Sequence, residues 1–331
     1  MKILKKIALS VLLMSTVSFA FSVDYTALAT GLSTGTVTKS INSGLNDFGD
    51  ELGFSVPQAA VQQNVYADAF IGKILPAVPP HFAVGIDAGL THLNTSGLSE
   101  AAEALGISGV NSSYYFPVFN ADIRIGGLIL PFDVGFSFMT LDVSKLNSMD
   151  VTNFTAEFWT LAADIRYAIL EGTALTPALS VGVGYSYNKG SFGASEDYAE
   201  VNVDYDVQTI YGQIQLSKGI KIPVANIGFV PFVGLRGVIS SYSNDWSWKL
   251  KGSIVSQVTS YAQNANLSLP GTSGAGTASS DGWGGFQPQV YGGIGFNFML
   301  IQLTASVCAD LRHISGDTQL WSGALALRLK L

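Results

Sequence analysis

Residues 177–188 read PALSVGVGYSYN, and their side chains alternate in size and polarity. One set is mostly apolar and large, and consists of Pro177, Leu179, Val181, Val183, Tyr185 and Tyr187. The residues between them are small or polar. Successive side chains of a β-strand point to opposite faces, so this stretch predicts a strand with one apolar and one polar face. Residues 286–298 and 320–331 repeat the pattern, which an amphipathic helix would not produce.

The chain is apolar overall but has no helical membrane span in its sequence pattern. Its mean hydropathy is +0.34 and only 12% of its residues are charged. The richest segment after the first twenty residues, GGIGFNFMLIQLTASV at 292–307, is interrupted by polar residues. A chain that crosses lipid must satisfy its backbone polar groups internally, which leaves helices and closed barrels. The sequence therefore predicts an all-β protein, a transmembrane antiparallel up-and-down β-barrel.

Ten segments carry the strand pattern, and short and long connections alternate between them. The expected strands are 81–92, 115–125, 132–142, 158–169, 177–188, 201–217, 227–239, 286–298, 301–312 and 320–331. The long polar links are 93–113, 143–157, 189–200 and 240–285. Outer-membrane barrels have short periplasmic turns, long external loops and an even strand number. The expected number is ten, or twelve if residues 64–72 and one partner also cross.

Residues 1–20 have the features of a secretory signal peptide. Lys2, Lys5 and Lys6 precede an apolar run, and Ser18-Phe19-Ala20 resembles a cleavage site. We therefore expect the protein to be exported. Together with the barrel pattern, this places it in the cell outer membrane of a Gram-negative-type envelope. Removing this segment would change the formal net charge from −7 to −10, which argues against a nucleic-acid partner. The expected domains are 1–20 signal peptide, 21–80 N-terminal plug or hatch, and 81–331 barrel.

Residues 21–80 do not follow the barrel pattern. Ile41, Leu45, Phe48 and Leu52 have helical spacing, which predicts a short amphipathic helix. NVYADAFIG at 64–72 alternates and fits either an additional barrel strand or part of a segment inside the lumen. We interpret 21–80 as a lumenal plug, with the additional strand as the alternative.

The tetrapeptide ADIR occurs at 121–124 and at 163–166, and ADLR follows at 309–312. In the predicted phase their charged residues face the lumen, because a lysine or arginine facing lipid at the bilayer centre costs about 2–4 kcal/mol. The lumen or pathway candidates are Asp87, Asp122, Arg124, Asp133, Asp164, Arg166, Arg236, Asp310, Arg312, Arg328 and Lys330. They form either a salt-bridge lattice that stabilises a narrow barrel or a lining that sets selectivity. Strand direction places Asp310 and Arg312 near the outer end and the other ADIR charges near the periplasmic end.

The segment 201–217 changes phase near Gln208. Val203, Tyr205 and Val207 form one apparent outward set, and Ile210, Ile214 and Leu216 form another. This predicts a bulge, or the point where the strand leaves the membrane. Aromatic residues mark membrane interfaces. The expected interface residues are Tyr185, Tyr187, Tyr205 and Trp321 at the outer side and Tyr167 at the inner side.

Two links contain apolar residues at helical spacing, GLSEAAEALG at 97–106 and GSIVSQVTSYAQ at 252–263. Apolar helices in external loops could cover the barrel mouth and capture a hydrophobic ligand, or pack against the rim. The candidate lid residues are Leu98, Leu105, Ile254, Val258 and Tyr261.

Residues that carry chemistry are sparse. Cys308 is the single cysteine, which excludes an intramolecular disulfide. The three histidines, His81, His92 and His313, form no Ser/His/acid set and no Cys/His cluster in the sequence. We therefore predict no enzymatic activity, no cofactor and no metal.

Two longer stretches carry a family resemblance. They are VPQAAVQQNVYADAFIGKILPAVPPHFAVGIDAG at 56–89 and FPVFNADIRIGGLILPFDVGFSF at 116–138. Together they resemble the long-chain fatty-acid transporter (FadL) family of outer-membrane proteins, as represented in spirochaetes. The resemblance implies uptake of small hydrophobic molecules such as long-chain fatty acids, captured by external loops and passed through a barrel that an N-terminal hatch gates.

The expected partners are outer-membrane lipid, the barrel-assembly machinery and a hydrophobic small-molecule ligand. Two alternatives stay open from the residues themselves. One is a porin-like or OmpW-like channel for small solutes, and the other is a non-transporting surface barrel that serves as an adhesin or structural protein.

Overall fold

The computed structural model describes residues 20–21, 24–62, 64–75, 81–105, 107–108, 110–142, 154–195, 198–222, 227–269, 271–312 and 319–331. The predicted signal peptide lies outside these residues except for Ala20, and His313 also lies outside them.

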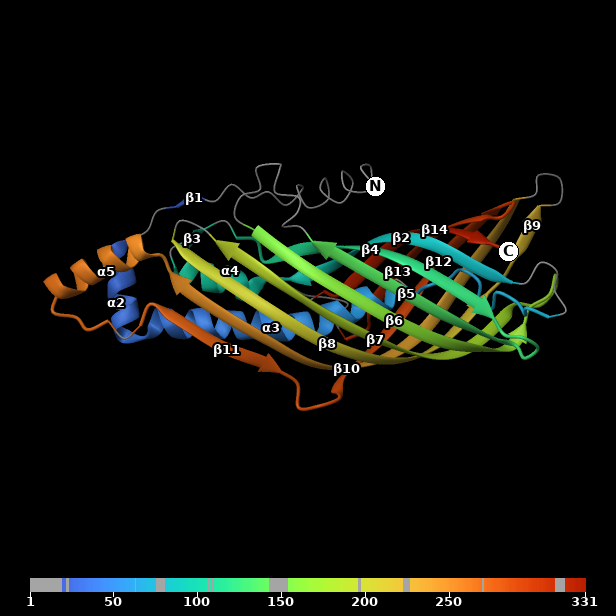
Figure 1. Cartoon of the computed structure of the whole chain (residues 1–331), viewed down its shortest axis with the longest axis horizontal. Helices are drawn as coiled ribbons and strands as arrows, with labels where there is room; N and C mark the ends of the chain where they lie inside the picture. Colours follow the sequence, from blue (N-terminus) through green and yellow to red (C-terminus); the bar gives the residue numbers. More distant parts are fainter. Residues whose placement is uncertain are drawn as a thin grey trace.

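Ten antiparallel strands form the wall of a closed barrel (Figure 1). They are β2 (Phe82–Asn94), β4 (Ser113–Gly126), β5 (Phe132–Asp142), β6 (Phe154–Glu171), β7 (Ala178–Ser195), β8 (Ala199–Ser217), β10 (Ile227–Leu250), β12 (Gly284–Phe298), β13 (Ile301–Asp310) and β14 (Trp321–Lys330). Each pairs with the next in this order, and β14 pairs with β2 to close the wall. The predicted ten-stranded barrel is confirmed.

Two short strands extend this wall at its ends but do not run its full length. β9 (Ile220–Ile222) and β11 (Ser273–Ser279) pair with opposite ends of β10. A separate two-residue ladder joins β1 (Ala20–Phe21) to β3 (Ile107–Ser108).

Two helices precede the barrel, α2 (Tyr25–Thr34) and α3 (Thr36–Gln62). Asp24 caps α2 by accepting a hydrogen bond from the Thr26 backbone nitrogen at 2.9 Å. Gly35, with a φ of 76°, adopts the left-handed conformation that ends α2 and lets α3 begin directly. The helix predicted from Ile41, Leu45, Phe48 and Leu52 is confirmed within α3, and all four side chains are buried.

The second half of α3 lies inside the barrel. Gln58 donates hydrogen bonds to the carbonyl of Cys308 in β13 and to the hydroxyl of Ser322 in β14, both at 3.3 Å. Residues 64–75 continue from the helix without forming a strand, and Val65, Tyr66 and Ala67 are buried. The segment therefore lies in the lumen, as the plug interpretation expects, and it does not add an eleventh or twelfth strand to the wall.

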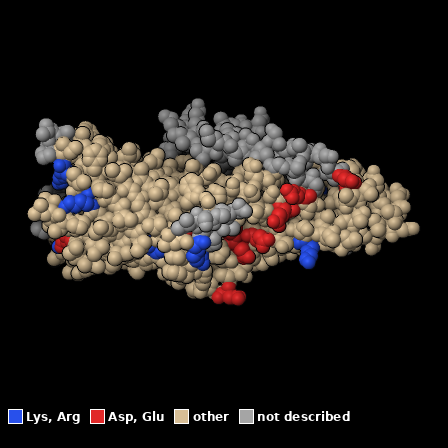
Figure 2. All heavy atoms as spheres, turned by 180° about the vertical axis from the view of Figure 1, so that it is seen from behind, with Lys and Arg blue, Asp and Glu red and all other residues tan. Residues whose placement is uncertain are grey.

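The outward face of the wall is apolar over a continuous band. Each barrel strand contributes exposed apolar side chains, among them Ile86, Ile123, Phe136, Ile165, Val183, Ile214, Leu235, Ile294, Val307 and Leu327. Figure 2 shows a band without charged side chains between the basic residues at one end and the charged residues farther along the molecule. His92, Tyr115 and Trp321 form an aromatic cluster at the ends of β2, β4 and β14 that lie away from the C-terminus, with the ring centroids of Tyr115 and Trp321 5.6 Å apart. This arrangement matches a lipid-facing surface bounded by an aromatic belt.

The bulge expected near Gln208 is wrong, whereas the alternative, that the strand leaves the membrane there, agrees with the burial of its side chains. Strand β8 pairs without interruption, and Val203, Tyr205 and Val207 are buried on its inner face. Tyr205 therefore does not mark an outer interface. The polar residues between them, such as Asn202 and Asp204, are exposed on the outer face. Above the lipid band the wall has water outside and α3 inside, so the polarity of its two faces is reversed.

The same reversal explains two misplaced loops. Strands β7 and β8 extend through most of the expected link 189–200, and β10 extends to Leu250 inside the expected link 240–285. That link also holds α5 (Gly252–Asn264) and β11. Helix α4 (Ser96–Ala104) occupies the link after β2, as predicted. None of the helices in the described part of the chain is long and apolar enough to cross a membrane.

Candidate functional site

The two ADIR segments meet at the lower end of the lumen, near the short turns. Arg124 on β4 forms ion pairs of 2.6 Å with Asp133 on β5 and with Asp164 on β6. Arg166 on β6 returns to Asp133 through Nε at 2.8 Å and Nη2 at 2.9 Å. All four side chains are almost completely buried. Three neighbouring strands are thus connected by charge in addition to their backbone ladders.

A glycine on the intervening strand makes the ion pair between β4 and β6 feasible. Gly135 on β5 lies opposite both Arg124 and Asp164 in the register. A Cβ atom at Gly135 would lie 2.4 Å from the Arg124 Nη2 and 2.6 Å from the Asp164 Oδ1. The side chains on β4 and β6 therefore meet across β5 because position 135 has none.

A second ion pair across a glycine lies on the other side of β4. Arg328 on β14 pairs with Asp122 on β4 through Nε and Nη2, both at 3.0 Å from Oδ2. The strand between them is β2, where Gly85 lies opposite both residues. A Cβ atom at Gly85 would lie 2.3 Å from the Arg328 Cγ. We call the six residues the floor cluster: Asp122, Arg124, Asp133, Asp164, Arg166 and Arg328.

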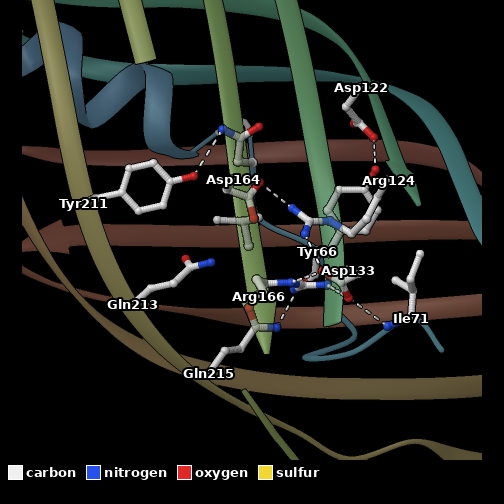
Figure 3. Close-up of polar contacts among 12 residues, drawn as sticks. Tyr66, Ile71, Asp122, Arg124, Asp133, Asp164, Arg166, Tyr211, Gln213 and Gln215 are labelled. Carbon is white, nitrogen blue, oxygen red and sulfur yellow. Dashed lines mark hydrogen bonds and ion pairs between the residues drawn. The ribbon is translucent and has the colours of Figure 1, made fainter. Parts of the chain in front are cut away.

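The plug contributes an aromatic ring to the centre of the floor cluster. The guanidinium carbons of Arg328, Arg124 and Arg166 lie 3.8, 4.6 and 5.8 Å from the ring centroid of Tyr66. The Tyr66 hydroxyl donates a hydrogen bond to Asp122. Figure 3 shows the ring beside Arg124, with Asp133 and Arg166 next to it. Each cation–π contact contributes about 0.5–2 kcal/mol, so three of them around one ring form a substantial attachment.

Backbone atoms of the plug bind the same side chains. Arg328 donates to the Val65 carbonyl at 3.0 Å and Arg166 to the Asp68 carbonyl at 2.9 Å. From the wall, Gln215 donates to the Tyr66 carbonyl at 2.7 Å. In the other direction, the Ile71 backbone nitrogen donates to Asp133 at 3.2 Å. The arginines therefore satisfy both the wall carboxylates and the irregular backbone of the plug, which has no strand partner.

Lys330 and Asp87 lie at the edge of the floor cluster. Lys330 pairs with Asp68 of the plug at 2.7 Å, and Gln302 donates to the same carboxylate at 2.7 Å. Asp87 is buried, 3.9 Å from Arg328, and lines a cavity of about 10 Å³ together with Gln62. This volume holds about one water molecule. The plug and the lumenal side chains thus fill this level of the barrel.

Arg236 lies higher in the lumen and has a different environment. It lies 4.5 Å from the ring centroid of Tyr291 and 5.3 Å from that of Tyr211. Its Nη2 donates to Gln213 at 3.2 Å. Among the described residues it forms no ion pair with a carboxylate. It belongs to a layer of amides and phenols and is separate from the floor cluster.

The third copy of the motif behaves differently from the first two. Asp310 is the last residue of β13 and is buried, whereas Arg312 lies beyond the strand and is exposed. The two form an ion pair of 3.6 Å, and the Arg312 guanidinium lies 5.5 Å from the Phe54 ring of α3. The structure therefore places this pair at the rim and not in the lumenal wall.

Most candidate lid residues are packed inside the structure. Leu105, Ile254 and Val258 are buried in the same apolar cluster as α2 and α3, and Leu98 packs against that cluster. Tyr261 is exposed and stacks on Tyr25 of α2, with centroids 6.3 Å apart. Of the two alternatives, packing describes these helices better than an exposed capture surface, because they bury their apolar faces against the N-terminal helices.

Several residues of the site were not predicted from the sequence. Tyr66, Asp68 and Gln215 connect plug and wall, yet each belongs to a common residue type in an ordinary context. One signal in the sequence could have indicated them. The plug segment contains an aromatic and an acidic residue, both of which can bind the arginines that the barrel directs into the lumen. Among the described residues, no group of three His, Cys, Asp or Glu side chains gathers as a metal site.

These features define a class, the transmembrane antiparallel β-barrel whose lumen is filled by its own N-terminal segment. No protein-family model and no curated protein sequence matches the chain.

Similar solved structures include the translocator domain of the autotransporter NalP from Neisseria meningitidis, with a TM-score of 0.35 and 8% identity over 78% of this chain and 91% of that one. The outer-membrane protease OmpT from Escherichia coli has a TM-score of 0.35 and 8% identity, over 76% of this chain and 97% of that one. A major outer membrane protein from Thermus thermophilus has a TM-score of 0.31 and 11% identity, over 76% of this chain and 98% of that one. The class assignment rests on the strand pairing and the exposed apolar band described above.

Proposed function

We propose that the protein is an outer-membrane transporter in which the N-terminal segment closes the lumen and moves to admit small hydrophobic molecules. The observation that carries this proposal is the attachment of residues 65–71 to the floor cluster. It consists of hydrogen bonds, an ion pair and cation–π contacts, with no covalent link. Non-covalent contacts can break and form again, so the segment closes the lumen and can still be displaced.

The upper lumen supports a hydrophobic substrate. Val203, Tyr205, Val207, Trp246 and Trp248 form an apolar inner wall around α3. A solute that replaced the helix in this region would meet apolar and aromatic side chains, which favour acyl chains over ions. Long-chain fatty acids have this chemistry, and their carboxylates would find arginine at the floor below.

Uptake into proteoliposomes tests the proposal. Wild-type protein and the Tyr66→Ala variant are reconstituted, and entry of a fluorescent long-chain fatty acid and of a radiolabelled disaccharide is followed. We expect entry of the fatty acid above protein-free vesicles, and faster entry with Tyr66→Ala. Equal entry of both solutes would support a porin-like channel. Entry of neither, with wild type or variant, would support a non-transporting surface barrel and overturn the proposal.

A further inference from the structure

A groove among the described residues lies at the loop end of the barrel, far from the floor cluster. It has a volume of about 560 Å³ and lies between the first half of α3 and the residues at the start of β11. The side chains that line it are polar: Thr38, Lys39, Asn42, Ser43, Asn46 and Ser273. The α3 residues recur at intervals of three or four and therefore occupy one face of the helix.

Two buried tryptophans fix the orientation of the groove amides. The indole nitrogen of Trp248 donates to Asn42 Oδ1 at 2.9 Å, and that of Trp246 donates to Asn46 Oδ1 at 2.7 Å. An indole N–H can only donate a hydrogen bond, so the oxygen of each amide must face the tryptophan. Each NH₂ group is left on the other side, and neither has a hydrogen-bond partner within the described part of the chain.

Strand β11 is built to permit this arrangement. Gly274 pairs with Trp248 and Gly276 pairs with Trp246. A Cβ atom at Gly274 would lie 2.5 Å from the Trp248 Nε1 and 2.9 Å from the Asn42 Oδ1. A Cβ atom at Gly276 would lie 2.4 Å from the Trp246 ring. The glycines therefore leave room for both indoles to reach the asparagines.

The resulting groove presents hydrogen-bond donors and one positive charge. Its donors are the NH₂ groups of Asn42 and Asn46 and the ammonium of Lys39, together with three hydroxyls that can donate or accept. No carboxylate and no aromatic face is among the lining residues. A neutral sugar offers donors as well as acceptors and commonly stacks on an aromatic ring, so it is poorly matched. An oxyanion offers acceptors only and matches this lining.

We propose that this groove binds the phosphate or sulphate ester of a larger molecule at the loop end of the barrel. The groove is far larger than one oxyanion, so the remainder of the ligand has space beside the anionic group. The groove exists while α3 lies beside Trp246 and Trp248, and binding there can be measured without transport.

The test is isothermal titration of the full-length protein in detergent with glucose 6-phosphate, glucose 6-sulphate and glucose. We expect at least tenfold tighter binding of one or both esters than of glucose. The comparison of the two esters identifies the oxyanion. Equal binding of glucose and both esters, or binding of none, would overturn the proposal.

An isosteric variant tests the role of the oriented amide. Asn42→Asp keeps the oxygen that accepts from Trp248 and replaces the NH₂ group by a second, negatively charged oxygen. We expect at least a tenfold loss of ester affinity with unchanged near-ultraviolet circular dichroism. Asn202→Asp, on the exposed outer face of β8, is the matched control and should bind like the wild type. Full ester affinity in Asn42→Asp would contradict the proposal even if wild-type protein binds.

Discussion

Arg124 and Asp164, from the two identical ADIR tetrapeptides, form a 2.6 Å ion pair across the glycine of the strand between them. The repeat is therefore a wall element in which β4 and β6 exchange charge over β5. Its third relative, ADLR, ends at the rim and takes no part in this lattice. The arginines of the lattice also hold the plug, so the stability of the wall and closure of the lumen depend on the same side chains.

A side chain at position 135 should break this bridge. We expect Gly135→Val to lower the free energy of unfolding by about 3–5 kcal/mol, the usual cost of separating a buried ion pair. The measurement is urea unfolding of the protein in lipid vesicles, followed by tryptophan fluorescence. Gly212→Val on β8 is the control, since a Cβ there has no atom within 4 Å. Equal destabilisation by both substitutions would show that the Arg124–Asp164 contact contributes nothing specific.

The edge of the lipid band can be located on a single strand. Ile214 and Asp204 both face outward on β8, but only Ile214 lies in the apolar band. We expect Ile214→Arg to cost about 2–4 kcal/mol and to reduce assembly into membranes, because the guanidinium would face acyl chains. Asp204→Arg faces water and should assemble normally. Heat-modifiable migration on gels reports folded barrel in both cases, and normal assembly of Ile214→Arg would place the band elsewhere.

The reversed polarity of the upper wall gives a second matched pair. Val207 is completely buried against the lumenal apolar cluster, whereas its neighbour Gln208 is partly exposed on the outer face. We expect Val207→Lys to destabilise the protein by several kcal/mol, because an unpaired ammonium would be buried. Gln208→Lys should change the urea midpoint little. The opposite ranking would restore the phase that the sequence alone indicated.

The sequence predicts the barrel well where one physical rule applies along a whole strand. Within the lipid band, apolar side chains must face outward, so period-two alternation identified all ten strands and the lumenal direction of Asp122, Arg124, Asp164 and Arg166. Above the band the outer medium is water and the inner surface is α3. Residues such as Val203 and Asn202 then alternate in the opposite sense, so the pattern assigns their faces the wrong way round. The polar outer faces of β7 and β10 there predict links at 189–200 and 240–285 in place of strand.

The attachment of the plug could not be predicted from local patterns. Tyr66 and Arg328 are separated by most of the chain, and their contact depends on the register of β14 against β2 and on the path of residues 64–71. Likewise, the fixed orientation of Asn42 depends on Trp248, which lies far along the chain on β10. Strand alternation carries no information about such pairs.

Cys308 offers a probe of plug position. It is buried on β13, and its backbone carbonyl accepts a hydrogen bond from Gln58 of α3. In folded wild-type protein we expect maleimide labelling to be much slower than in urea, since both plug and wall shield the thiol. Displacement of the plug should increase the rate. Equal rates in the folded and unfolded protein would show that the lumen is open at this level.

Conductance across planar bilayers tests the central claim most directly, namely that the N-terminal segment closes the lumen and that Tyr66 holds it there. We compare wild-type protein with Tyr66→Ala and with Tyr167→Ala, which removes an exposed tyrosine from the outer face. The account predicts that wild-type protein and Tyr167→Ala are closed for most of the recording, and that Tyr66→Ala opens in frequent discrete steps. Large steady currents through the wild type, or a closed Tyr66→Ala variant that still shows heat-modifiable migration, would contradict it.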